Sequence, residues 1–199
     1  MVVFGLHFGA ETCASMGAVK GELFEFTDLR EVPAHLVSFC GISLVSAGSA
    51  YYHWRPNSQR LVWDRLPMTM VFMCFLSIIL SETLGPEWGA PLLPLLLAAG
   101  AGSVAYWHLT DDLTPYAAVQ FGPLLLAPFL LATFEPRYSH SWLYLGVLAC
   151  YAAAKATEAN DARIFVATGR RLSGHSLKHL LAAAATGVYY IQLRARVVL

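Results

Sequence analysis

Charged side chains are scarce in this sequence. Only 13% of its 199 residues are Asp, Glu, Lys or Arg, about half the share usual in soluble domains, whereas 57% are hydrophobic. So few charges cannot solvate the surface of a globular domain of this size. The 13 basic and 13 acidic side chains give a formal net charge of zero and form no basic tract, so we expect no nucleic-acid partner.

Paired cysteines and a signal peptide are also lacking. None of the four cysteines belongs to a C-x-x-C pair, and three of them lie in apolar runs, so we interpret them as small core residues. The first 24 residues contain several ionisable side chains and no short apolar region followed by a small-residue cleavage site. We therefore predict no signal peptide, and we treat residues 1–30 as an N-terminal segment separate from the long apolar runs.

Long runs without Asp, Glu, Lys or Arg dominate the rest of the chain. Crossing the hydrocarbon layer takes about 20 residues, and in lipid the backbone must satisfy its own hydrogen bonds. No alternating pattern typical of barrel strands is present, so each run is predicted to be a helix. We predict an all-α, polytopic transmembrane helix bundle with six spans in one domain, residues 31–199. The uncharged runs are 32–54, 66–81, 88–110, 113–134, 138–154 and 179–193.

The connections between six spans must alternate between two membrane faces. One face would carry 55–65, 108–112 and 155–178, which hold eight of the thirteen Lys and Arg residues. The positive-inside rule makes this face cytoplasmic. We therefore expect a multi-pass membrane protein whose partners include the bilayer itself.

The ionisable residues of interest gather at that same face. His175 and His179 are four positions apart, on one side of a helix and near enough to bind one metal ion. His53 closes the first span and would supply the third ligand; three protein ligands plus water is the catalytic arrangement of zinc. Ser49 lies one turn from His53, and Asp64 opens the next span within reach of the bound water. We predict Zn²⁺ on His53, His175 and His179, with Ser49 and Asp64 as catalytic residues.

Less specific interpretations compete with this one. The histidine pair could simply face solvent on a helix surface, Ser49 could serve helix packing, and Asp64 could pair with the adjacent Arg65. His108 with Asp111 and Asp112 is a rival ligand cluster, although those carboxylates can also be read as a solvated loop. A haem-binding electron carrier also uses histidines on membrane helices, but usually on facing helices rather than four positions apart on one.

Two motifs resemble a known family. Ser49-Ala-Tyr-Tyr-His53 followed by Asp64, and His175-Ser-Leu-Lys-His179, are similar in type and order to the S-x3-H, Asp and H-x3-H of the alkaline ceramidases. That family lies within a membrane-hydrolase superfamily that includes the adiponectin and progestin receptors, and the closing motif has the form of its bacterial members. Family members have seven spans, so the resemblance implies a weak or degraded first span in the N-terminal segment, residues 1–30. The acidic calcium site of the eukaryotic enzymes is not recognisable in this sequence.

The resemblance implies a function and a location. It implies that zinc is held by His53, His175 and His179, that Ser49 and Asp64 assist at the metal-bound water, and that the substrate is a ceramide-like lipid amide, cleaved to a sphingoid base and a fatty acid. It also implies the inner membrane of a bacterium, in which the positive-inside rule places the zinc site near the cytoplasmic face. The alternative is a non-catalytic, zinc-containing receptor or scaffold of the same superfamily.

Overall fold

The computed structural model describes residues 24–199, which are almost entirely helical and contain no strand. The prediction of an all-α fold is therefore confirmed for this part of the chain. The predicted weak first span in 1–30 lies almost wholly outside the described residues. A 3-10 helix, η1 (Leu29–Glu31), is followed by α2 (Val32–Trp54), α3 (Ser58–Leu84), α4 (Pro86–Thr110), α5 (Thr114–Thr133), α6 (Leu143–Ala159), α7 (Asp161–Ala167) and α8 (Gly174–Ala195).

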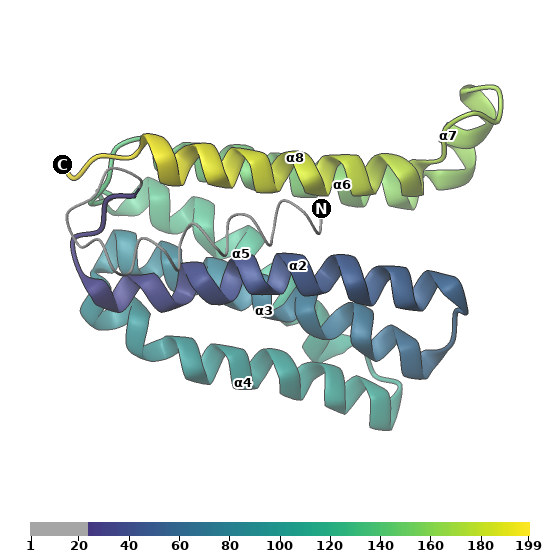
Figure 1. Cartoon of the computed structure of the whole chain (residues 1–199), viewed down its shortest axis with the longest axis horizontal. Helices are drawn as coiled ribbons and strands as arrows, with labels where there is room; N and C mark the ends of the chain where they lie inside the picture. Colours follow the sequence, from purple (N-terminus) through teal and green to yellow (C-terminus); the bar gives the residue numbers. More distant parts are fainter. Residues whose placement is uncertain (1–23) are drawn as a thin grey trace. The chain divides into compact units, whose positions relative to one another are not determined.

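The helices form two compact units (Figure 1). The first contains α2 to α5 and extends to Arg137, with Val198 added from the end of the chain. The second contains α6 to α8, from Tyr138 to Val197, together with Leu199.

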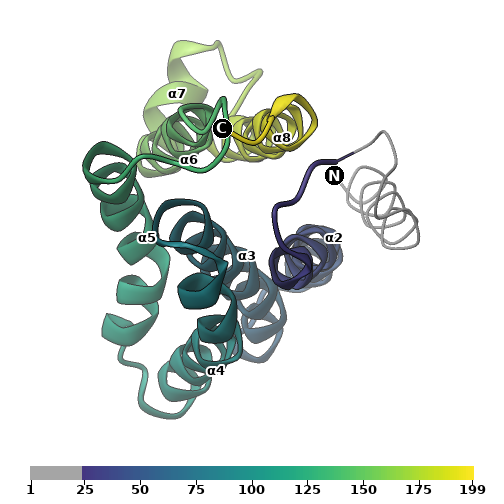
Figure 2. The same cartoon turned by 90° about the vertical axis from the view of Figure 1, so that its left-hand side faces the viewer.

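In the first unit α3 is the central helix. It packs against α2, α4 and α5, which flank it in the end-on view of Figure 2. Its start is set by Asn57, whose Oδ1 accepts a hydrogen bond from the backbone N–H of Arg60 at 2.8 Å. Its end is set by Gly85, whose φ of +118° is a conformation that favours glycine. The central position explains why α3 supplies much of the buried apolar core: Met73, Cys74, Leu76, Ile78 and Ile79.

In the second unit α6 and α8 run side by side as a helical hairpin, and α7 lies in the connection between them (Figure 1). Close packing is possible because Gly146 on α6 faces Val188 on α8, where an added Cβ would lie 3.3 Å from the valine Cγ1. The rings of Tyr144 and Tyr189 also meet, with centroids 6.4 Å apart. The hairpin thus carries the C-terminal histidine motif at its α7 end.

Within residues 24–199, four helical segments are long and apolar enough to cross a membrane: Leu29–Trp54, Ser58–Leu84, Pro86–Thr110 and Thr114–Thr133. They coincide with the first four predicted spans. The fifth and sixth predicted spans are helical too, but α6 has only 17 residues, and α8 includes charged side chains. Neither is among the four, so the count of six spans remains a prediction.

The outward surface of the apolar helices agrees with a lipid environment. Leu95 on α4 is 66% exposed, and Leu125 and Phe129 on α5 are 73% and 61% exposed. Large apolar side chains directed away from the core are expected where the solvent is lipid rather than water.

Candidate metal centre

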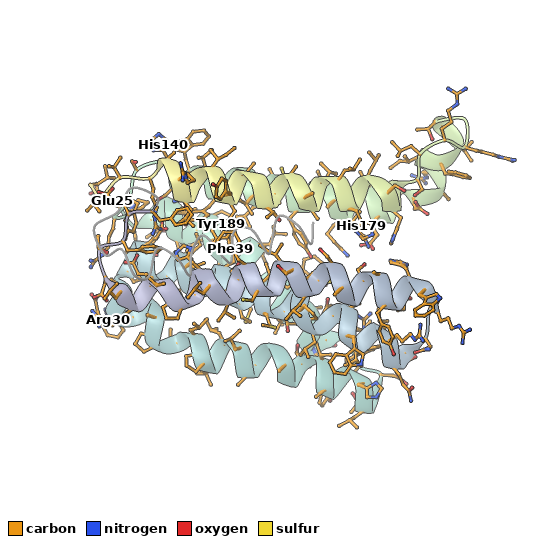
Figure 3. The ribbon with its side chains drawn as sticks, viewed as in Figure 1. Glu25, Arg30, Phe39, His140, His179 and Tyr189 are labelled. Atoms are coloured by element: carbon orange, nitrogen blue, oxygen red, sulfur yellow. The ribbon has the colours of Figure 1, made fainter. Side chains whose placement is uncertain are left out.

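The two histidines of the C-terminal motif face each other at the start of α8. Ser173 is the N-cap of this helix, so His175 lies in its first turn and His179 in the next. Their Nε2 atoms are 3.1 Å apart and their ring centroids 4.8 Å apart, with the rings at 78° to each other. Figure 3 shows His179 toward the end of α8 that follows α7 in the chain. The two imidazoles thus lie side by side, as their spacing predicts, and their role as metal ligands stays a prediction.

The separation of the two nitrogens suits a shared metal ion. Zinc binds imidazole nitrogens at about 2.0–2.1 Å in a tetrahedron, which places two such nitrogens about 3.3 Å apart. Without metal, the same 3.1 Å lets one ring donate its N–H to the other ring. Both side chains are half-buried, so the pair is neither in bulk water nor sealed in a core. The two Nε2 atoms would therefore need to move little to bind one metal ion in place of the hydrogen bond between them.

His53 and Ser49 lie together at the C-terminal end of α2, in the first unit. His53 is in the last turn, exposed, with its ring edge against Tyr52 at a centroid distance of 5.1 Å. Ser49 is one turn earlier and half-buried. The helical spacing therefore puts the hydroxyl and the imidazole on one side of α2, as the sequence predicts.

Asp64 lies against this same part of α2 because a glycine permits it. A Cβ added at Gly48 would be 2.1 Å from the carbonyl oxygen of Trp63 and 3.3 Å from the Cα of Asp64. No side chain fits in that space, so the backbone of α3 lies directly on the turn of α2 that carries Ser49. Within the first unit the structure thus brings Ser49 and the half-buried Asp64 into neighbouring positions.

Arg65, next to Asp64, is held by aromatic rings. Its guanidinium carbon lies 3.9 Å from the ring centroid of Trp107 on α4 and 5.0 Å from that of Tyr116 on α5. Both rings belong to a buried apolar cluster with Val104. Such cation–π contacts are worth about 0.5–2 kcal/mol each. They anchor the first turns of α3, and so the backbone of Asp64, to α4 and α5.

The rival cluster at the end of α4 has a structural explanation. Asp111 ends the helix with a φ of +58°, and one carboxylate oxygen of Asp112 accepts a hydrogen bond from the backbone N–H of Thr114 at 2.9 Å. Hydrogen bonds from Thr114 lower the pKa of Asp112. His108 is exposed and its ring lies beside Trp107. The backbone of Asp111 and the carboxylate of Asp112 thus shape the turn into α5.

Two contacts around the histidine pair, made by Asp161 and by Lys178, were not predicted from the sequence. Asp161, the first residue of α7, accepts a hydrogen bond through Oδ1 from the backbone N–H of His175 at 2.7 Å. Lys178 on α8 donates to Glu158 Oε1 on α6 at 2.7 Å, and Lys155 donates to Oε2 at 2.6 Å. The Asp161 and Lys178 contacts join partners that are separated by 14 and 20 positions across a turn, so no local spacing rule could have found them.

The carboxylate of Glu158 is held in its charged form. Burial raises the pKa of Glu158. The hydrogen bonds from Lys155 and Lys178, together with their positive charges, lower it by more than burial raises it, so that the pKa is about 2. The group lies at the C-terminal end of α6, where a negative charge is otherwise unfavourable. The two lysines offset this cost.

Comparison with known proteins identified no matching family model, curated protein or solved structure. The resemblance of the two motifs to the alkaline ceramidases therefore stays a prediction.

Proposed function

We propose that this chain is a zinc-dependent hydrolase of the membrane that cleaves the amide bond of a ceramide-like lipid. The observation that carries the proposal is the histidine pair of α8, whose Nε2 atoms are 3.1 Å apart in a half-buried setting. The resemblance of the S-x3-H, Asp and H-x3-H motifs to the alkaline ceramidases supports the reaction class.

The donor set suits zinc chemistry. His175 and His179 supply two imidazoles, and His53 is proposed as the third. Three protein ligands leave one coordination position open, which is the catalytic rather than the structural arrangement. All three ligands are nitrogens, a set that zinc accepts readily.

Asp64 and Ser49, beside the metal, would then have separate roles in the reaction. Zinc, when bound, supplies a Lewis acid for the scissile carbonyl and a water whose pKa falls to about 7. Asp64 accepts the proton of the attacking water and passes it to the leaving amine. Ser49 donates a hydrogen bond to the carbonyl oxygen as negative charge develops on it.

The positions of Ser49, His53 and Asp64 at the ends of apolar helices support a lipid as the substrate. Ser49 and His53 are near one end of α2, and Asp64 near the matching end of α3, both helices being apolar enough to cross a membrane. A scissile amide at the membrane surface would reach these groups while its acyl chain stays among apolar helices. In this proposal α6 and α8 also cross, the site lies near the cytoplasmic face, and the membrane is a bacterial inner membrane.

The test is metal content followed by activity. Purified protein is expected to hold about one zinc per chain, as a single three-histidine site implies. His53→Ala, His175→Ala and His179→Ala should each strip it, whereas His108→Ala, in the rival cluster, should retain it. Full zinc occupancy in the His175 and His179 variants would refute the site, and loss in the His108 variant would favour the rival cluster.

Hydrolysis of a panel of lipid amides separates enzyme from receptor. Release of fatty acid by the zinc-loaded protein, absent from the His175→Ala variant, is the expected result. Zinc binding without hydrolysis of any lipid amide would instead favour a zinc-containing receptor or scaffold. A haem signal in a reduced-minus-oxidised visible spectrum would overturn both.

A further inference from the structure

The first turn of α8 is a weak place for a metal ligand. Backbone N–H groups in the first turn of a helix have no partner within the helix, and terminal turns fray. In α8 the first helical residue is Gly174, which loses more conformational freedom on folding than any other residue. His175 follows directly. Unless something outside α8 holds this turn, the imidazole of His175 would not stay opposite that of His179.

Two side chains accept hydrogen bonds from backbone N–H groups of this turn, one from the N-cap of α8 and one from another helix. The hydroxyl of Ser173 accepts from the backbone N–H of Ser176 at 3.0 Å, as an ordinary N-cap does. The N–H of His175 is bound at 2.7 Å by Asp161, a half-buried residue of α7 that is 14 positions earlier in the chain. The backbone of a proposed metal ligand is therefore fixed by a neighbouring helix.

An ion pair joins the beginning of α8 to the end of α6, a region that we call the α6–α8 junction. Lys178, one residue before His179, reaches Glu158 on α6 at 2.7 Å, and both side chains are half-buried, with exposed fractions of 23% and 34%. Lys155 binds the same carboxylate at 2.6 Å but lies on the same helix, three residues from Glu158. Of these two contacts, it is the one from Lys178 that connects the two helices.

The backbones at this junction are also in close approach. A Cβ added at Gly174 would lie 2.1 Å from the carbonyl oxygen of Thr157 on α6 and 2.8 Å from the Cα of Asp161. Glycine is thus required where α8 begins. The same residue that permits the approach makes the turn flexible, so the polar contacts must supply the order that the glycine lacks.

We infer that Asp161 and the Glu158–Lys178 ion pair are positioning residues that hold the first turn of α8, and with it His175, in the conformation that binds the metal. The inference rests on the proposed function for the identity of the ligands. The inferred residues do not touch the metal. Asp161 acts through the backbone of His175, and the ion pair acts through α8, the helix that carries both His175 and His179.

The first test is the affinity of the full-length protein for zinc alone, measured by competition with a chelator. Outer contacts that orient metal ligands typically contribute about 10–100-fold to affinity, so Asp161→Ala and Lys178→Met should each weaken binding within that range. Asp161→Asn should stay close to the parent, because its amide oxygen can still accept from the N–H of His175. Lys155→Met is the matched control: it removes a lysine from the same carboxylate without uncoupling the helices, and should leave affinity unchanged.

The second test measures how well ordered the same turn is, and it needs neither bound metal nor an activity assay. Amide hydrogen exchange in peptides covering 173–180 of the zinc-free protein should be faster in Asp161→Ala and Lys178→Met than in the parent. Exchange in α3 should be unchanged, which shows that the variants remain folded. If Asp161→Ala fails this check, it is replaced by Asp161→Asn and Asp161→Ser: Asn keeps an acceptor oxygen at the position that binds the N–H of His175, whereas the shorter Ser does not.

The outcomes separate this inference from the proposed function. Parental zinc affinity and parental exchange in both Asp161→Ala and Lys178→Met would overturn the positioning role while leaving the zinc site intact. Equal losses in Lys155→Met and Lys178→Met would also overturn it, because charge rather than the inter-helix contact would then be responsible. Retention of zinc by His175→Ala and His179→Ala would refute the proposed function itself.

Discussion

Ser49 and Asp64 are proposed to act beside the metal without binding it, which makes their removal informative. Ser49→Ala and Asp64→Asn are both expected to keep zinc and lose most hydrolysis. Losing one donor to the developing oxyanion typically costs about 10²–10³ in kcat. Losing a general base typically costs about 10²–10⁴. Zinc analysis and turnover of a lipid amide, measured on the same preparations, would check both.

A matched control lies on the same helix. Ser43 is also half-buried on α2, and its hydroxyl donates to the carbonyl of Phe39 at 3.1 Å, so Ser43→Ala should retain parental turnover. If Asp64→Asn empties the zinc site, Asp64 is a ligand or its essential support, and the proposed role of Asp64 as a general base is wrong. If both Ser49→Ala and Asp64→Asn hydrolyse at the parental rate, the receptor or scaffold interpretation becomes the better one.

At the level of single residues, the sequence predicts contacts within a helix far better than contacts between helices. The His175–His179 pair follows from helical periodicity alone, because positions four apart lie on one side. The contact of Asp161 with the N–H of His175 depends on how the chain turns between α7 and α8, which no periodicity describes. The close approach at Gly48 is likewise visible only once α2 and α3 are packed.

The packing of α2 against α3 makes a prediction at the level of elements. In a helix interior, Gly→Ala normally stabilises by about 0.5–1 kcal/mol. At Gly48 the new methyl group would lie 2.1 Å from the Trp63 carbonyl oxygen, so the helices must separate. Overpacking of this kind typically costs about 1–3 kcal/mol. Gly48→Ala should therefore lower the thermal unfolding midpoint in detergent, and reduce hydrolysis because Asp64 moves.

Gly102 on α4 is the control for this substitution, since nothing lies within 4 Å of a Cβ added there. Gly102→Ala should leave the unfolding midpoint unchanged or raise it. A midpoint for Gly48→Ala equal to that of Gly102→Ala would contradict the close contact between α2 and α3.

The α6–α8 junction should weaken in acid. The pKa of Glu158 is lowered from 4.5 to about 2 by its lysines, against burial, so the ionised carboxylate favours the folded state. This contribution is complete above about pH 4.5 and is lost as the pH falls toward about 2. Other carboxyl groups titrate in the same window, so the measurement is the difference in unfolding midpoint between the parent and Glu158→Gln. That difference should shrink between about pH 5 and about pH 2, and a constant difference would show that the ion pair does not contribute.

Helix existence is predictable from uncharged runs, whereas helix ends are not. The run 66–81 marks α3, but the helix begins eight residues earlier, at Ser58, because Asn57 caps it there. Similarly, α8 begins at Gly174 rather than at the run 179–193, because Ser173 supplies the cap. Lipid sets where charges are excluded, but hydrogen bonding sets where a helix starts. The site residues Asp64, His175 and His179 all lie in these polar extensions or at their edge.

At the level of the whole molecule, the residues that would make α8 functional also make its membrane role hard to predict. His175, Lys178 and His179 reduce the hydropathy of the helix that carries them, and α6 has only 17 residues, the lower limit of about 17–25 for a crossing. The four longer helices are free of this conflict because they contribute at most one or two site residues near an end. Hydropathy alone therefore leaves α6 and α8 undecided.

Side-specific labelling of single cysteines would decide whether α6 crosses the membrane. In a background with all four native cysteines replaced by alanine, Arg55→Cys, Glu135→Cys and Arg171→Cys place one thiol each at an exposed position outside the four apolar helices. An impermeant maleimide applied to sealed vesicles of known orientation then reports the side of each.

With six spans, Arg171→Cys should label from the same side as Arg55→Cys, and Glu135→Cys from the opposite side. The reason is topological: α3 to α5 cross three times between positions 55 and 135, and α6 must cross once more to return the chain to the first side. Only then can the start of α8, three residues beyond Arg171, be on the side of the membrane where α2 ends with His53. If Arg171→Cys labels with Glu135→Cys instead, α6 does not cross. His175 and His179 would then be separated from His53 by the bilayer, and no zinc site could contain all three.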